Sequence, residues 1–183
     1  METKNYQLKV TLRYTRPPIW RRLEVRGDTT LERLHDTLQI AMGWTDSHLH
    51  QFVAKGVIYG APDHDWGQQI EDEAVVRLDQ ILRRPKAKLL YEYDFGDSWQ
   101  HEVVLEKLLP LDPECHAGGA LVTGGRRACP PEDCGGVGGY YRLLGILTDP
   151  KHPEHEDMLT WVGGAYDADH FDVEDANRFL RGG

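Results

Sequence analysis

Two closely spaced histidines, His48 and His50, are the side chains in this chain of 183 residues that most resemble metal ligands. If their segment is a β-strand, the two-residue spacing places both imidazoles on one face, as in some metal sites. A third ligand is needed, and His101 is the natural candidate because the pattern around it turns its side chain inward. No cofactor is assigned, but if the three side chains converge, His48, His50 and His101 would form a site for a divalent metal such as zinc. The alternative is that His101 is a core histidine hydrogen-bonded to a tyrosine or to Asp97.

Two further clusters of polar residues are candidates for binding or chemistry, and no residue is assigned as catalytic. The candidate pocket lies on a predicted hairpin and consists of Tyr93, Asp94, Asp97, Trp99 and His101. The second candidate cluster lies on a proline-containing loop and consists of Cys129, Glu132, Asp133 and Cys134. A zinc site on this loop would need more ligands, which Cys115 with His116, His152 or His155 could supply. The alternative is a structural loop whose carboxylates precede a helix N-terminus, where negative charge is stabilising.

Other motifs for catalysis or phosphate binding are incomplete. The glycine-rich segment 135–139 precedes a predicted helix but lacks the Lys-Ser/Thr pair of a P-loop. Residues 167–172 begin like a calcium loop, but Phe171 occupies a ligand position and Asp172 stands where glycine is required. The sequence contains neither a Gly-x-Ser-x-Gly nor a His-Glu-x-x-His motif. These absences argue against hydrolases built on those schemes.

The strongest alternation of apolar and polar residues runs from residue 89 to residue 105 and predicts a β-hairpin at about 87–108. The apolar faces of its two strands coincide only if the loop has an odd number of residues. We therefore expect a three-residue loop over residues 96–98. The predicted pairs are Phe95 with Trp99, Tyr93 with His101 and Tyr91 with Val103. In this register the side chain of His101 points toward the core.

The remaining patterns predict the elements that position these residues. Alternation predicts a strand at 6–13, and β-branched and aromatic residues predict a second at 19–25. Further strands are expected at 47–54 and 57–59. A capping box at residues 29–32 precedes a helix over about 30–42, in which His35 and Asp36 are expected to be solvated. A short helix is expected at 78–82, and further helices follow residue 137, one of them opened by Asp172 as its N-cap. The resulting strand–strand–helix–strand–strand opening is also the order of the β-grasp fold.

The predicted fold class is α+β, with a mixed β-sheet, the hairpin and a C-terminal group of helices. One domain over residues 1–183 is expected because the chain has the length and hydrophobic content for one well-buried core. Within it we expect a sheet part at about 1–109, a Gly/Pro/Cys-rich loop at about 110–138 and helices at about 139–181.

Composition and charge limit the partners and the compartment that we expect. The net charge is −9, but the first 33 residues carry eight basic and four acidic side chains, so the rest carries −13. This balance disfavours direct nucleic-acid binding and makes a protein partner the main expectation. No apolar run suits a bilayer and no leader is visible, so we expect a cytoplasmic protein without membrane contact. Three cysteines, an odd number, argue against a disulfide framework.

Four segments of the chain, taken in order, resemble a known family. They are residues 16–22 (RPPIWRR), 47–52 (SHLHQF), 91–101 (YEYDFGDSWQH) and 129–136 (CPPEDCGG) together with Tyr140. The sequence is similar to the Ri-plasmid open-reading-frame-three family, also called the insertion-element passenger TnpR family. The resemblance covers nearly the whole chain and implies one α+β domain. It brings no established catalytic residues, and the chain shows no recombinase chemistry.

Three functional hypotheses follow. The first is a cytoplasmic, non-enzymatic binding or adaptor module that serves a mobile-element or DNA-related complex through a protein partner. The second is a metal-dependent enzyme with a His/Asp site near the central hairpin, where a bound metal would activate water. The third is direct DNA binding through the basic N-terminal quarter, which would weaken steeply with salt and be lost on charge reversal at Arg21 and Arg22.

Overall fold

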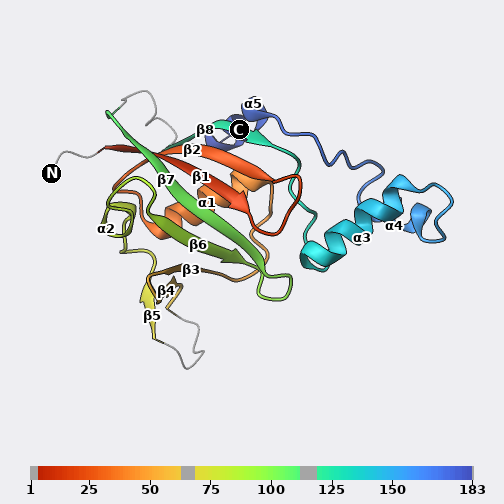
Figure 1. The fold of residues 1–183 in the computed structure, drawn as a ribbon, viewed down its shortest axis with the longest axis horizontal. Coiled ribbons are helices and arrows are strands. Elements are labelled where there is room, and N and C mark those ends of the chain that lie inside the picture. The colour runs from red at the N-terminus through yellow and green to blue at the C-terminus, as the bar shows by residue number, and fades with distance from the viewer. Residues whose placement is uncertain (1–3, 63–68, 112–118, 183) are drawn as a thin grey trace.

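The computed structural model describes residues 4–62, 69–111 and 119–182, which contain an eight-stranded β-sheet (Figure 1). Along the sheet the strands are ordered β5-β4-β3-β6-β7-β1-β2-β8. Their bounds are β1 Asn5–Leu12, β2 Trp20–Arg26, β3 His50–Ala54, β4 Val57–Gly60, β5 Ile70–Asp72, β6 Lys88–Tyr93, β7 Trp99–Leu109 and β8 Ala120–Arg126. Neighbouring strands are antiparallel except β4 and β5, which are parallel. The predicted α+β class and its opening order are confirmed, with β1 antiparallel to both of its neighbours.

Helix α1 (Leu31–Met42) lies against one face of the sheet (Figure 1). Its apolar stripe, including the fully buried Leu34 and Leu38, packs into the same core as the inward side chains of the strands. Thr30 is the N-cap, and its hydroxyl accepts the N–H of Arg33. The predicted capping box at residues 29–32 is therefore wrong, because the third helical residue is an arginine rather than an acid. Gly43 ends the helix with a positive φ of 97°.

The hairpin of β6 and β7 has the predicted odd loop, but the loop is five residues long, so the predicted register is wrong by two residues. The observed pairs are Tyr93 with Trp99, Tyr91 with His101 and Leu89 with Val103. Asp94 ends β6 because its φ is 57° and its Oδ1 accepts the N–H groups of Gly96 and Asp97. Phe95 is consequently exposed. The side chains predicted to point inward from the two strands still do so, and His101 is fully buried.

Strand β8 lies inside the segment predicted as a loop at about 110–138, so that part of the prediction is wrong. Its glycines suggested a loop, but Gly125 is required by packing, because a Cβ there would lie 2.3 Å from Cε1 of Phe171. The Phe171 ring also stacks on the buried guanidinium of Arg21, 3.7 Å away. Arg21 Nε donates to the carbonyl oxygen of Ala41, 2.7 Å away in the last turn of α1. Burial lowers the pKa of Arg21 to about 10.

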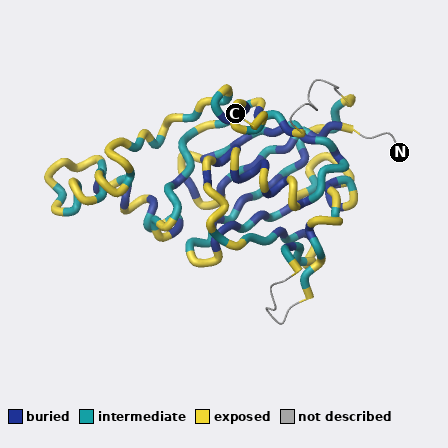
Figure 2. The backbone as a smooth tube through the Cα atoms, turned by 180° about the vertical axis from the view of Figure 1, so that it is seen from behind, coloured by how far each residue is buried: buried dark blue, intermediate teal, exposed yellow. Residues whose placement is uncertain are grey.

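The remaining helices are α2 (Leu78–Ile81), α3 (Gly136–Thr148), α4 (His155–Trp161) and α5 (Val173–Leu180). Helices α3 and α4 extend away from the sheet as an arm (Figure 2), in which α3 has four buried residues and α4 has none. Asp172 caps α5 as predicted, and Asn177 pairs its side-chain amide with the backbone N–H and C=O of Val122 in β8. This pairing returns the C-terminal end to the sheet. No helix of the described chain is long and apolar enough to cross a bilayer.

Candidate functional site

A cleft of about 620 Å³ lies beside α1 at the end of the sheet formed by β3, β4 and β5. Its carboxylates are those of Glu32, Asp36, Asp46 and Glu73. Part of its wall is apolar and comes from Ile58, Tyr59 and Ile70. Among the described residues that line it there is no lysine or arginine. The cleft therefore presents negative charge beside an apolar wall.

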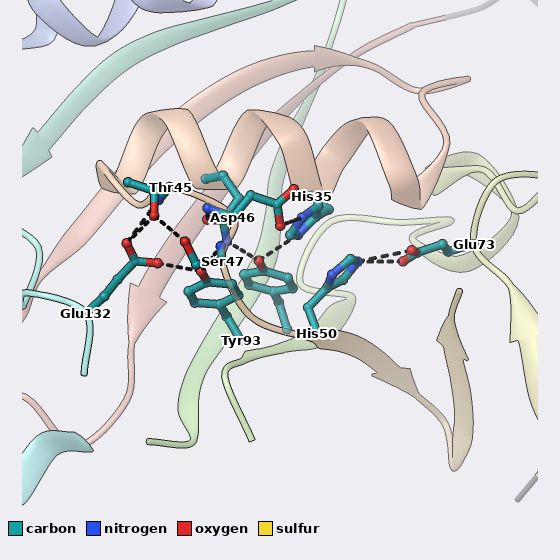
Figure 3. A network of polar contacts seen from close by, with 10 residues as sticks. His35, Thr45, Asp46, Ser47, His50, Glu73, Tyr93 and Glu132 are labelled. Atoms are coloured by element: carbon teal, nitrogen blue, oxygen red, sulfur yellow. Dashed lines mark hydrogen bonds and ion pairs between the residues drawn. The ribbon is translucent and has the colours of Figure 1, made fainter. Parts of the chain in front are cut away.

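Two stacked imidazoles, His35 from α1 and His50 from the start of β3, lie on one side of the cleft (Figure 3). Their ring centroids are 3.4 Å apart and the planes differ by 4°. Each ring meets its own carboxylate: His35 Nε2 lies 2.8 Å from Asp46 Oδ1, and His50 Nε2 lies 2.9 Å from Glu73 Oε2. Glu73 is buried, whereas the side chain of Asp46 is 56% exposed. Asp46 is thus the accessible carboxylate of this group.

The hydrogen bonds around His35 determine its tautomer. The backbone N–H of Asp46 donates to Gln39 Oε1, so the amide nitrogen of Gln39 must face the Tyr91 hydroxyl and donate to it. The buried Tyr91 hydroxyl then donates its own proton to His35 Nδ1, 2.8 Å away. His35 therefore carries its proton on Nε2 and donates it to Asp46 Oδ1. These hydrogen bonds run from the backbone N–H of Asp46 through Gln39, Tyr91 and His35 and end at the carboxylate of Asp46. The closed ring of bonds holds this carboxylate and the His35 ring in place.

The electrostatics agree with a neutral His35. Burial, followed by the adjacent imidazole of His50, lowers the pKa of His35, although Asp46 opposes the shift. Burial also raises the pKa of Tyr91 well above its usual value. Both groups are thus neutral hydrogen-bonding partners near pH 7.

The second candidate cluster lies on the loop that follows β8, and this loop docks on residues 44–47, which connect α1 to β3. Glu132 accepts hydrogen bonds from the Thr45 hydroxyl and the Tyr93 hydroxyl, and Tyr93 in turn accepts the N–H of Ser47 (Figure 3). Trp44 Nε1 donates to a backbone oxygen of the same loop, 3.0 Å away. Burial and the bond to Glu132 raise the pKa of Tyr93. The loop is therefore fixed to the segment that supplies Asp46 to the cleft.

The structure does not bring His48, His50 and His101 together. His48 lies on a bend before β3, so the alternation that would place it beside His50 does not apply. His48 instead faces Asp94 and Asp133, and His50 faces Glu73.

His101 and Trp99 are fully buried, so the predicted hairpin pocket does not form around them. The His101 ring packs against Trp44 and Tyr91, and neither of its nitrogens makes a hydrogen bond of normal geometry. The predicted bond to a tyrosine or to Asp97 is therefore absent, and Asp97 accepts the backbone N–H of Gly135 instead.

The two described cysteines are free thiols. Burial raises the pKa of Cys129 well above its usual value and the pKa of Cys134 to about 12. Both are therefore in the thiol form near pH 7. The reactive form, which acts as nucleophile and metal ligand, is the thiolate. Cys115 and His116 lie outside the described residues, so the zinc site that would use them is not placed.

The sequence interpretation missed His35, Asp46 and Glu73. His35 was expected to be solvated, which is wrong, because it follows Leu31 by four residues and so shares the buried stripe of α1. That spacing was a usable signal. Asp46 and Glu73 lie outside regular elements, and only the tertiary fold brings them to the two imidazoles.

Comparison with known proteins gives three consistent findings. The family described as plasmid pRiA4b ORF-3-like protein has a sequence model that matches residues 4–175. The chain is 40% identical over 164 residues to the uncharacterized protein y4hQ of Sinorhizobium fredii, covering 88% of this chain and 83% of that protein. It is also similar to the crystal structure of MM3350, a protein of unknown function from Methanosarcina mazei Go1. That similarity has a TM-score of 0.85 and 37% identity, covering 96% of this chain and 97% of the other.

Proposed function

The chain belongs to the plasmid pRiA4b ORF-3-like family, and we propose that within this family it acts as a binding protein whose cleft receives a small organic cation. The ligand class is an amine or guanidinium group carried on an apolar body. One observation carries the proposal: the cleft contains four carboxylates and an apolar wall, and no described lining residue is a lysine or arginine. A cationic group would gain charge-assisted hydrogen bonds there, and its apolar body would be buried against the wall.

Asp46 is the expected anchor of the cationic group. Its side chain is 56% exposed, and one of its oxygens is already fixed by His35 Nε2. A carboxylate held in place before the ligand arrives loses little freedom on binding. His35 provides a neutral imidazole beside it, stacked on the ring of His50, because burial lowers the pKa of His35.

Calorimetry with a matched series of ligands tests the charge preference. Hexylamine, hexanol and hexanoate share one carbon chain and differ in the charge of the head group, and agmatine adds a guanidinium. We expect binding of agmatine and hexylamine, and at least tenfold weaker binding of hexanol and hexanoate. Equal affinity for hexylamine and hexanoate would contradict the proposal.

An isosteric variant tests the anchor. Asp46→Asn keeps an oxygen that accepts the proton of His35, so the cleft should retain its shape while losing one charge. Loss of a charge-assisted hydrogen bond of about 1.5–3 kcal/mol predicts affinity about 10- to 100-fold weaker. Asp157→Asn, on the exposed face of α4, removes the same charge elsewhere and should bind like the unmodified protein.

A metal-dependent enzyme is the second candidate, because ligand atoms of His35, Asp46 and His50 lie within 4.8 Å of one another. The organic cation is favoured at this position, because the proton of His35 Nε2 already occupies the space between the ring and Asp46.

Direct DNA binding has less support. Arg21 is buried, and the guanidinium groups of Arg22 and Arg26 are paired with Glu106 and Asp28. Charge reversal at Arg21 would disturb the core rather than a surface for phosphates.

A further inference from the structure

We propose that His48, Asp94 and Asp133 form a binding site for one divalent transition-metal ion, such as Zn²⁺ or Mn²⁺, which joins three loops of the fold. The three residues come from the segment before β3, the hairpin loop and the loop that follows β8. One ligand atom from each lies within 4.8 Å of the other two. The site shares no residue with the group of His35, Asp46 and His50, although His48 also lines the cleft. The proposal does not depend on the cleft binding an organic cation.

The distances around His48 fit metal ligands better than hydrogen bonds. His48 Nε2 lies 3.3 Å from Asp133 Oδ1 and 3.8 Å from Asp94 Oδ2. Although Nε2 is shielded from solvent, it makes no aligned hydrogen bond. Ligand atoms about 2.0–2.1 Å from a tetrahedral ion are about 3.3 Å apart, which is close to the shorter of these separations. By contrast, His35 Nε2 and Asp46 Oδ1 are 2.8 Å apart, which is the distance of a hydrogen bond, and the proton on Nε2 lies between them.

Asp94 is held in a ligating position by its own loop. Its Oδ1 accepts two backbone N–H groups, from Gly96 and Asp97, so Oδ2 is the oxygen presented to His48. Its backbone N–H donates to the carbonyl of Leu49, and its carbonyl accepts from the N–H of Ser98. Such outer contacts orient metal-binding carboxylates in known sites.

Asp133 is fixed by its neighbours in the chain. Glu132 is bonded to Tyr93, and the N–H of Gly135 donates to Asp97 Oδ2 in the hairpin loop, 3.1 Å away. The φ of Asp133 is 58°, a backbone conformation that few residues other than glycine, asparagine and aspartate adopt. The ring of His48 is held by an edge-on contact with Tyr93, 5.8 Å between centroids.

The negative charge of Asp94 and Asp133 also favours a bound cation. Within the described chain, the imidazole of His48 is the basic side chain that faces the carboxylates of Asp94 and Asp133, and no lysine or arginine pairs with either. A divalent ion would balance both carboxylates and give the orphaned Nε2 a partner. Imidazole with carboxylate oxygens is a ligand set that suits zinc, manganese or iron.

The test uses the full chain, prepared without a histidine tag and stripped with a chelator. Titration with Zn²⁺ alone is followed by calorimetry, and Co²⁺ is followed by its visible absorption. We expect one ion per chain and an increase in the melting temperature on binding. The proposal is overturned if no stoichiometric binding occurs.

Conservative variants locate the ion. Asp94→Asn and Asp133→Asn retain a side chain that tolerates a positive φ, and Asp133 is exposed, so both variants are expected to fold. Each should weaken Zn²⁺ binding at least tenfold, whereas Asp46→Asn and Asp157→Asn should bind as the unmodified protein does. Loss of binding in Asp46→Asn with retention in Asp133→Asn would place the ion at the stacked imidazoles and overturn the assignment.

Discussion

Replacing the buried His101 should remove a large part of the acid sensitivity of the fold. His101 is fully buried between Trp44 and Tyr91 without a hydrogen bond of normal geometry. Burial lowers its pKa from 6.5 to about 3, although nearby backbone groups of Tyr91 and Trp99 oppose the shift. The folded protein therefore keeps this imidazole neutral at a pH where the unfolded chain takes up a proton.

The sign and size of the effect follow from this difference in pKa. Above pH 6.5 both states are neutral, and the stability contributed by a neutral His101 is fully present. As the pH falls from 6.5 toward 3, the unfolded state gains a proton that the folded state does not, so the free energy of unfolding decreases. The loss is about 2 kcal/mol at pH 5 and approaches about 5 kcal/mol at the lower limit.

Urea denaturation at pH 7.5 and pH 5 measures the effect. His101→Leu has no titrating group at this position, so its free energy of unfolding should fall by about 2 kcal/mol less than that of the unmodified protein over this range. Replacing the exposed His170 by leucine is the matched control and should leave the pH dependence unchanged. An unchanged pH dependence in His101→Leu would refute the reasoning that His101 is buried in its neutral form.

Four further variants probe other contacts in the fold and around the site. Gly139→Ala should destabilise the fold by about 2–3 kcal/mol in urea, because the new Cβ would lie 1.8 Å from a preceding backbone oxygen. Gly138→Ala, where nothing lies within 4 Å, should be neutral or stabilising. Glu132→Ala should lower the raised pKa of Tyr93, which ultraviolet titration of the phenol measures, because one cause of the shift is removed. Asn177→Leu should cost about 2 kcal/mol in the same urea assay, because two backbone groups of β8 lose their buried partners.

Local patterns were enough to predict most elements and the inward face of the hairpin. The apolar stripe identified α1, the alternation identified β1, β6 and β7, and the β-branched and aromatic content identified β2. The hairpin register was not predictable from alternation, because a shift by two residues preserves every face. The deciding feature is the side chain of Asp94, which accepts two backbone N–H groups of its own loop, so that β6 ends at Tyr93, two residues before Phe95.

The sites depend on contacts between distant segments, which spacing along the chain does not reveal. The sequence around Gly125 resembles a loop, because the reason for a glycine there is the close contact with the ring of Phe171, 46 positions later in the chain. Asp133 and His48 were assigned to different clusters, yet the docking of the loop after β8 brings them within 3.3 Å. The candidate residues were therefore partly identified, whereas their grouping required the fold.

Binding of an organic cation in the cleft is tested most directly by a two-dimensional NMR titration of the isotope-labelled chain with agmatine. We expect saturable shifts at Asp46, His50 and Tyr59 around the cleft, and their loss in Asp46→Asn. Saturable shifts that instead gather on the arm of α3 and α4, or no shifts at millimolar agmatine, would contradict binding in the cleft.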